Sequence, residues 1–229
     1  MTKHRESVIQ NVIRILKMID RRDYEIPRIN FVTDTISNDG YYHSTYENNF
    51  VTKFNEKYAI LEGLQEIPNR QDLQRQLQIT KKYIYSEYKD PKVERYYEKL
   101  RKKYGDLVEN KIEFETIPDF FIHKDQYDRS PENQKLIIEF KTEINIPEKR
   151  FMWDFFKLNL YVEKYNYQTA CFICINNSKS YVEDLLTQYL EDKHYLATQR
   201  GKIYILIQEN FDSDIQYFSL ESFISKYEY

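Results

Sequence analysis

Glycine is scarce in this chain of 229 residues, with only four occurrences at widely separated positions. Phosphate-binding loops need closely spaced glycines, because their backbone amides must approach the phosphate oxygens without side chains in the way. The sequence therefore holds neither a dinucleotide-binding GxGxxG motif nor a P-loop GxxxxGK[ST] motif. At the level of motif, this excludes nicotinamide-dependent dehydrogenases and P-loop nucleotide hydrolases.

Cysteine is also rare: Cys171 and Cys174, in the stretch TACFICIN, are the two in the chain. A CxxC spacing suggests a zinc or redox site, but this stretch is apolar and β-prone, which is typical of a buried strand. Residues three apart in a strand point to opposite faces of the sheet. We therefore expect the two sulfur atoms to diverge and to serve as small core residues. Two free thiols also fit a reducing compartment.

Long apolar runs are missing as well. No stretch approaches the run of about 18 apolar residues that spans a membrane. Charged and polar residues interrupt the N-terminal sequence MTKHRESVIQNVIRILKMID, unlike the apolar centre of a signal peptide. We therefore expect a soluble, cytoplasmic protein. The net charge of -3 gives no overall basic character, so binding to nucleic acid would depend on a local cluster of cations.

Hydrophobic periodicity predicts that the part of the chain before Asp90 is rich in helices. Apolar residues recur at helical spacing in residues 5–21. From Ser44 the sequence STYE forms a capping box, with Glu47 in the first turn of a helix that Pro68 ends. The other expected segments are an extended stretch at 24–35, a turn at 36–43 and a polar helix at 69–88.

From Asp90 onward, strands and helices alternate. Asp90 caps a helix that has Pro91 in its first turn and ends at Gly105. The elements expected after it are strands at 110–123 and 134–143, a helix at 148–165, a strand at 168–176, a helix at 180–196, strands at 201–208 and 214–220, and a final helix at 220–227. This order predicts an α/β fold, a sheet with helices on its faces. We expect residues 90–229 to form the core and residues 1–89 a helix-rich N-terminal elaboration, in the same domain or as a subdomain.

Three charged residues lie at the ends of two adjacent predicted strands: Asp119, Glu139 and Lys141. Glu139 and Lys141 are two residues apart and share one strand face, and the predicted hairpin brings Asp119 beside them. Two carboxylates at one position of a sheet make an oxygen-ligand site for a hard cation such as Mg²⁺, for which Mn²⁺ would substitute. The ammonium group of Lys141 would orient or deprotonate an attacking water, or stabilise charge on phosphorus. Phosphodiester hydrolysis needs these parts.

The chain resembles the PD-(D/E)XK nuclease superfamily at Pro118-Asp119 and, about twenty residues later, at Glu139-Phe140-Lys141 in an apolar strand. The helix and buried strand that follow are also in the expected order, so the resemblance covers about residues 90–176. It implies a restriction-endonuclease-like α/β/α core with a mixed central sheet. It also implies Mg²⁺-dependent cleavage of DNA or, less often, RNA, with Asp119 and Glu139 as metal ligands. Many nucleases of this superfamily act as dimers, which makes a homodimer one candidate state.

The superfamily often adds an acid from a helix that precedes the first strand. Glu94 is the first choice because its helix comes directly before the strands, with Glu98 as a neighbour; Glu47, further upstream, competes with it. Each also fits an ordinary helix-start glutamate favoured by the helix dipole. Some members place a Gln and a Tyr four residues apart on the following helix. Here Lys157 precedes Tyr161, a departure that leaves Lys157 as a phosphate contact or a solvated surface residue.

Binding to nucleic acid would need cations near this site. Lys102 and Lys103, in the stretch KLRKKY, and Arg150 join Lys157 as candidate phosphate contacts, although each also fits a solvated surface. His123 shares a strand face with Asp119 and is expected to be a partly buried residue near the site. The remaining candidates in the flanking segments are Lys99, Arg101, Lys124, Arg129 and Lys149, and His43 is expected in a turn.

The leading interpretation is a metal-dependent endonuclease that hydrolyses phosphodiester bonds of DNA. A chain without helicase or methylase motifs favours restriction or anti-phage defence, and an RNA endonuclease stays open. The alternative is a non-catalytic module on the same fold, which binds nucleic acid or forms a complex. In one version of that alternative, Glu139 and Lys141 serve only as a salt bridge within the sheet.

Overall fold

The computed structural model describes residues 2–30, 35–42, 47–67, 73–77, 90–105, 118–124 and 130–226. Within these residues the chain forms a six-stranded sheet in the order β3-β4-β5-β6-β7-β8. The sheet is mixed, because β5, β6 and β7 run parallel and the outer pairs run antiparallel. The strand bounds are β3 Gln74–Leu77, β4 Phe120–His123, β5 Gln134–Lys141, β6 Thr169–Ile175, β7 Ile203–Gln208 and β8 Gln216–Ser219.

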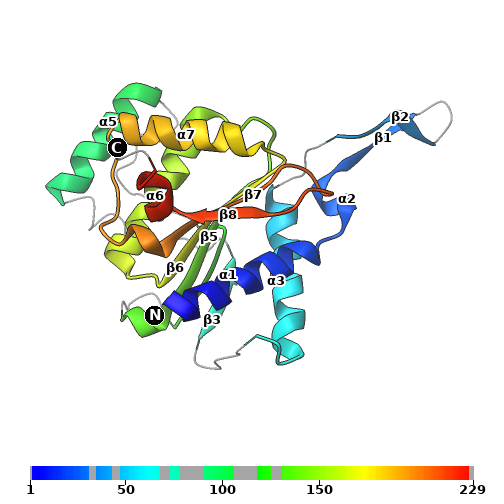
Figure 1. The fold of residues 1–229 in the computed structure, drawn as a ribbon, viewed down its shortest axis with the longest axis horizontal. Helices are drawn as coiled ribbons and strands as arrows, with labels where there is room; N and C mark the ends of the chain where they lie inside the picture. Colours follow the sequence, from blue (N-terminus) through cyan, green and yellow to red (C-terminus); the bar gives the residue numbers. More distant parts are fainter. Residues whose placement is uncertain are drawn as a thin grey trace.

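Helices cover both faces of this sheet (Figure 1). Helices α1 and α3 pack on one face, and α5, α6, α7 and α8 pack on the other. The helix bounds are α1 Thr2–Lys17, α2 Arg21–Tyr24, α3 Glu47–Gly63, α5 Pro91–Tyr104, α6 Glu148–Tyr165, α7 Lys179–Glu191 and α8 Leu220–Ile224. The predicted α/β class is therefore confirmed, and the predicted order of elements after Asp90 is found in the described residues.

Helix α5 shows how local sequence sets an element. The side chain of Asp90 accepts a hydrogen bond from the Lys92 backbone amide, and Pro91 occupies the first turn, where its missing amide costs no helical hydrogen bond. The helix ends at Gly105, whose φ of 64° disfavours other residues. The capping box predicted from Ser44 and the stop predicted at Pro68 lie outside the described residues; helix α3 begins at Glu47.

The helix predicted over residues 69–88 is wrong where the structure describes it, because residues 74–77 form strand β3. This strand pairs antiparallel with β4, so that Arg75 lies opposite Ile122. Arg75 also forms an ion pair with Glu62 of α3. Pairing with the sheet and this contact outweigh the weak helical preference of a polar segment. The part of the chain before Asp90 thus supplies an edge strand of the central sheet, besides the helices of one face.

The turn predicted at 36–43 is also wrong, since β2 (Thr35–Tyr42) forms an antiparallel hairpin with β1 (Ile26–Asn30). The register shifts within the hairpin, where residues 37–40 lie opposite a single residue of β1. The Asn-Asp-Gly signal therefore marks an irregularity inside the strand instead of a turn. Figure 1 shows this hairpin projecting away from the central sheet.

Two hydrophobic cores lie on opposite faces of the sheet, and the CxxC pair is divided between them. Cys174 belongs to the core beneath α6 and α7, whereas Cys171 belongs to the core beneath α1 and α3. Both cysteines are fully buried free thiols. The prediction that the two sulfur atoms diverge is confirmed, and this spacing makes no metal or redox pair.

Among the described helices, none combines the length and the apolar character that crossing a membrane requires.

We predict that neither cysteine reacts with a thiol reagent such as DTNB in the native protein. Burial raises the pKa of both thiols, so thiolate is scarce, and core side chains block the reagent. The measurement is release of the coloured thiolate with time, with the protein unfolded in guanidinium as the control that exposes both cysteines. Native reaction at the rate of an exposed thiol would contradict the buried placement.

Candidate functional site

The carboxyl end of β5 carries side chains into both layers of the molecule. Glu139 and Lys141 share a strand face with Ile137, which lies in the core beneath α6. Phe140 points to the opposite face and packs against Phe50 and Phe54 of α3, with ring centroids 5.7 and 5.1 Å apart. Phe140, which lies between Glu139 and Lys141, therefore packs α3 against the sheet.

This packing brings Glu47, in the first turn of α3, to the end of β5. Its Oε2 lies 3.0 Å from the Nζ of Lys141. Glu94, the first choice from the sequence, lies on the exposed face of α5. Helix α5 is held against α6 by other residues, including an Asp90–Lys164 ion pair. Of the two competing glutamates, the structure brings Glu47 to Lys141.

Asp119 lies just before β4, and the antiparallel pair of Phe120 with Ile138 brings it next to the end of β5 that carries Glu139. Residues directly opposite in such a pair point to the same face. The Oδ2 of Asp119 accepts a hydrogen bond of 2.7 Å from the backbone amide of Phe140. This bond fixes the carboxylate against β5, as the predicted hairpin required.

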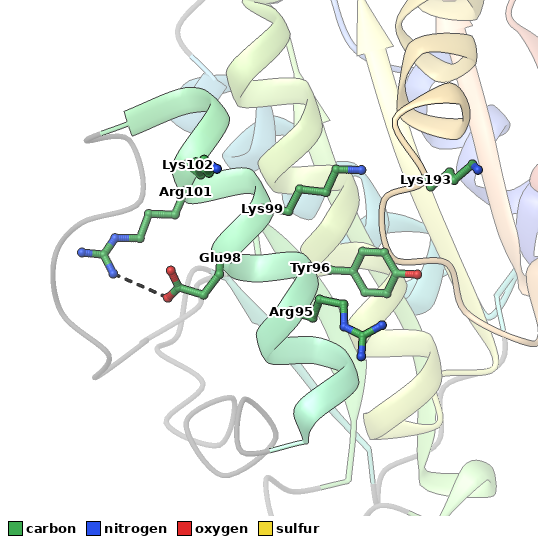
Figure 2. A pocket seen from close by; sticks show the side chains of 7 residues that line it. All are labelled: Arg95, Tyr96, Glu98, Lys99, Arg101, Lys102 and Lys193. Carbon is green, nitrogen blue, oxygen red and sulfur yellow. Dashed lines mark hydrogen bonds and ion pairs between the residues drawn. The ribbon is translucent and has the colours of Figure 1, made fainter.

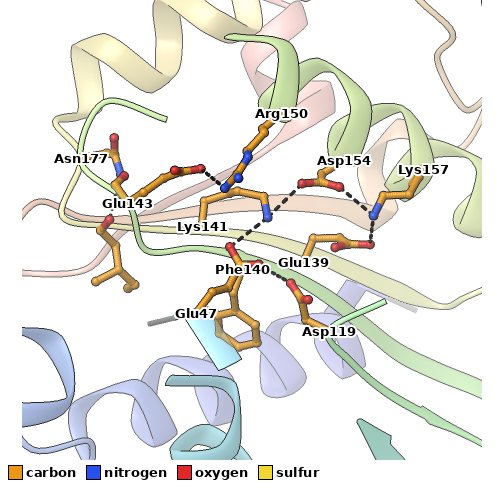
Figure 3. A network of polar contacts seen from close by, with 11 residues as sticks. Glu47, Asp119, Glu139, Phe140, Lys141, Glu143, Arg150, Asp154, Lys157 and Asn177 are labelled. Carbon is orange, nitrogen blue, oxygen red and sulfur yellow. Dashed lines mark hydrogen bonds and ion pairs between the residues drawn. The ribbon is translucent and has the colours of Figure 1, made fainter. Parts of the chain in front are cut away.

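Helix α6 adds two residues to the site (Figure 3). Asp154 Oδ2 lies 2.9 Å from Lys141 Nζ, and Asp154 Oδ1 lies 2.6 Å from Lys157 Nζ. Lys157 Nζ in turn lies 3.4 Å from Glu139 Oε1. Lys141 therefore pairs with Asp154 and Glu47, and the salt bridge considered between Glu139 and Lys141 is not the contact that forms. We call this set the carboxylate–lysine cluster: Glu47, Asp119, Glu139, Lys141, Asp154 and Lys157.

Asp154 was not predicted as a site residue, although the sequence carries a signal for it. Asp154 and Lys157 interrupt the apolar stretch FMWDFFKLNLY. They are three residues apart, so they lie on the same side of a helix. Both are buried on α6. Charged residues on a buried helix face need partners, and the acid and lysine at the end of the preceding strand were the nearest candidates.

The carboxylate–lysine cluster carries more negative than positive charge. Four carboxylates and two ammonium groups give a charge of -2 when all six are ionised. Burial is deep: Glu139 is 1% exposed, Lys141 4% and Asp119 7%. Charges that are removed from water need compensation nearby. The cluster is therefore short of two positive charges, which either protons or a divalent cation would supply.

The pKa values of three carboxylates in the cluster reflect this lack of positive charge. Burial raises the pKa of Glu139 well above its ordinary value, and Lys157 offsets only part of the effect. Burial also raises the pKa of Asp119, against the influence of Lys141 and the Phe140 amide. The pKa of Glu47 follows the same pattern, with burial as the main cause. These three carboxylates are hard to ionise together without an added cation.

Asp154 behaves in the opposite way. Burial alone would raise its pKa, but Lys141 and Lys157 flank its two oxygens and together hold the pKa at about 2. The pKa values of both lysines are raised, mainly by Asp154 acting against burial. Asp154 is therefore the main counter-ion of the two ammonium groups. Glu47 is paired with Lys141, so Glu139 and Asp119 are the carboxylates left available to a cation.

The available donors fit a hard divalent ion such as Mg²⁺. They are carboxylate oxygens, and Mg²⁺ takes one or two of these with water for its other ligands. Within the described part of the chain, the buried Oε1 of Glu139 accepts no hydrogen bond and has only the ion-pair contact of 3.4 Å with Lys157. No group of three or more His, Cys, Asp or Glu side chains in these residues is arranged to hold a metal. Asp119 and Glu139 are the two carboxylates that would hold such an ion.

The cations predicted to bind nucleic acid are placed in different surroundings. Lys157 is buried in the carboxylate–lysine cluster and is neither a surface residue nor an exposed phosphate contact. Arg150 is paired with Glu143 beside the cluster, and Lys103 is paired with Asp192. The remaining ones are Lys99, Lys102, Lys124 and Lys149, which are exposed, Arg101, which is half-buried and paired with Glu98, and Arg129, which lies outside the described residues.

Among the described residues, neither histidine considered from the sequence is part of the carboxylate–lysine cluster. His123 is fully buried in β4, where its Nε2 forms a hydrogen bond of 2.8 Å with Gln76 of β3. It therefore joins two strands. His43 lies outside the described residues.

Comparisons with family models, with curated proteins and with solved structures gave no match for this chain.

We predict that, in the presence of EDTA, Asp154→Asn lowers the stability of the protein and Glu139→Gln does not. Glu139→Gln removes a carboxylate that is costly to ionise, so its free energy of unfolding at neutral pH should equal or exceed that of the wild type. Asp154→Asn leaves two buried ammonium groups without their main partner and should cost about 3–5 kcal/mol. Urea denaturation measures both; equal losses in the two variants would contradict the assignment of charges.

The pH dependence should distinguish the same two groups. Because folding raises the pKa of Glu139 above 4.5, the folded chain holds the extra proton, and stability falls as the pH rises above that value. This fall should be smaller in Glu139→Gln. Folding lowers the pKa of Asp154 from 3.8 to about 2, so its contribution is present above pH 3.8 and is lost as the pH approaches 2. Denaturation at a series of pH values tests both signs.

Proposed function

We propose that this protein is a metal-dependent nuclease that hydrolyses phosphodiester bonds, with DNA as the first substrate to test. One observation carries the proposal: a buried carboxylate pair, Asp119 and Glu139, meets two lysines at a strand end with a charge of -2 in the whole cluster. An anionic site of this composition attracts a divalent cation. The lysines would then face a phosphate that the cation brings close.

Each residue of the cluster has a role in this proposal. Asp119 and Glu139 hold the cation, and Lys141 donates hydrogen bonds to the attacking water or to a phosphate oxygen. Glu47 and Asp154 hold the Lys141 ammonium group from two sides, and Lys157 neutralises Glu139. The divalent ion would supply Lewis-acid stabilisation of charge on the phosphate.

The fold proposal is a restriction-endonuclease-like core. Its support is the order of elements around the site: a β4–β5 hairpin bearing Asp119 and the Glu-Phe-Lys sequence, then α6, then β6 parallel to β5. This is the order that the resemblance to the PD-(D/E)XK superfamily implies. A role in restriction or anti-phage defence depends on that resemblance alone.

A non-catalytic module is the second candidate, and one observation favours it. Lys141 is 4% exposed and already paired with two carboxylates, so its charge is satisfied within the protein. A purely structural cluster would have this property too. The two candidates differ in their response to a cation, because a structural cluster would gain nothing from one.

We predict that Mn²⁺ or Mg²⁺ raises the unfolding temperature of the wild type. Binding to the folded state alone contributes about 2.7 kcal/mol at a concentration of 100 times Kd. The rise should be lost in Glu139→Gln and kept in Glu94→Gln, which makes the same chemical change on the exposed face of α5. Thermal unfolding with and without EDTA is the measurement. A wild type that is indifferent to both ions would favour the structural module.

We predict that the protein cleaves nucleic acid only with Mg²⁺ or Mn²⁺ and that Glu139→Gln lowers the rate by about 10²-fold or more. Supercoiled plasmid, linear duplex, single-stranded DNA and RNA form the substrate panel, with EDTA as the control. Lys141→Ala should also be inactive. Because that change removes the ammonium partner of Glu47 and Asp154, the folding of the variant is checked first by circular dichroism.

A matched pair of variants decides which glutamate acts. Glu47→Gln should lower the rate, since Glu47 contacts Lys141, and Glu94→Gln should not. The opposite result would favour the choice made from the sequence. Metal-independent cleavage, or equal activity of Glu139→Gln and wild type, would remove the proposed mechanism.

A further inference from the structure

Helix α5 carries an open, basic groove on the surface of the protein (Figure 2). The groove has a volume of about 740 Å³. Five of its seven lining residues are cations, and Glu98 is the one acid among them. The lining residues are Arg95, Tyr96, Glu98, Lys99, Arg101, Lys102 and Lys193.

The groove is positively charged, although the chain as a whole is negatively charged. Five cations and one carboxylate give a charge of +4, whereas the whole chain carries -3. Glu98 is paired with Arg101 at 3.5 Å, and Lys99 donates to the backbone oxygen of Asp192. Exposed cations also come from both walls of the groove, with Arg95 and Lys102 on α5 and Lys193 just beyond α7. Local charge of this kind draws anions even to an acidic protein.

The spacing of these cations suits a repeating anion. Arg95, Lys99 and Lys102 follow one another at intervals of four and three residues, which places them along one side of α5. Arg95 and Lys102 are seven residues apart, or about 10 Å along the helix axis. A duplex rises about 10 Å over three base pairs, with a phosphate on each strand at every step. An open groove with several cations in a row fits such a polymer better than a single small anion.

The groove is separate from the carboxylate–lysine cluster. Tyr97 of α5 packs against Trp153 of α6, with ring centroids 5.9 Å apart, while the adjacent Asp154 faces Lys141. Helix α6 thus has the cluster on one side and α5 on another. Lys103, which the sequence placed with Lys102, is paired with Glu148 and Asp192 and does not line the groove.

We propose that this groove binds the phosphate backbone of a nucleic acid, away from the bond that is cut. The inference rests on the proposed function for the identity of the anion. Its physical basis is the row of exposed cations: phosphate contacts supply affinity and position without reading the sequence of bases. The groove would hold the substrate, and the carboxylate–lysine cluster would act on it.

The test is binding in EDTA, where a metal-dependent site cannot cut. Fluorescence anisotropy of a labelled duplex is measured over a series of KCl concentrations for the wild type and for Arg95→Gln/Lys102→Gln/Lys193→Gln. All three side chains are exposed, so the fold should be kept. Lys92→Gln is the matched control for each single variant, since it also removes one exposed cation, from a position of α5 outside the groove.

The expected result is a weaker affinity of the triple variant for duplexes of unrelated sequence. The slope of log K against log[salt] should fall by about 0.9 for each phosphate that the variant no longer neutralises, or by about 2 to 3 in total. Each single variant should show a part of this decrease. The Lys92→Gln slope should equal that of the wild type.

Three results would overturn the proposal. The first is equal affinity and salt slope in the wild type and the triple variant. The second is an equal decrease in Lys92→Gln, which would indicate a diffuse charge effect. The third is binding to anionic phospholipid vesicles through these residues with no binding to nucleic acid. Binding by the groove without any cleavage would keep this inference and overturn the proposed nuclease, so the two fail separately.

Discussion

The Lys141 ammonium group, buried between Glu47 and Asp154, is the interaction that joins the layers of this protein at the site. Glu47 comes from α3 on one face of the sheet, Asp154 from α6 on the other, and Lys141 from the strand between them. Removing Lys141 would leave Glu47 without this ammonium partner and Asp154 with Lys157 alone. The Lys141 side chain therefore helps to hold the two helical layers together at this end of the sheet.

Strand alternation couples this charge cluster to the hydrophobic core. Phe140 stands between Glu139 and Lys141 and packs on the aromatic face of α3. Its amide also holds Asp119. The side chain of Phe140 thus packs against the helix that carries Glu47, and its backbone amide orients the Asp119 carboxylate. The positions of the charged groups therefore depend on hydrophobic packing on the opposite face of the sheet.

Much of this architecture was predictable because the signals were local. Alternating apolar strands and capped helices predicted the elements after Asp90, and the predicted hairpin placed Asp119 beside Glu139; β4 and β5 do pair antiparallel. Strand β3 was missed because its polar sequence has no apolar period, and only pairing with β4 makes it a strand. Glu47 was ranked below Glu94 because the order of elements along the chain does not show which helix packs against Phe140.

The two outermost strands of the sheet affect the tendency of the folded protein to aggregate at high concentration. Within the described residues, β3 and β8 are each four residues long and lie partly exposed, while the strands between them are buried. A long edge strand would offer many backbone hydrogen bonds to a neighbouring molecule, and edge strands of four residues offer few. The apolar strands β5, β6 and β7, the segments most prone to aggregate, are therefore shielded on both sides by strands poorly suited to pairing between molecules.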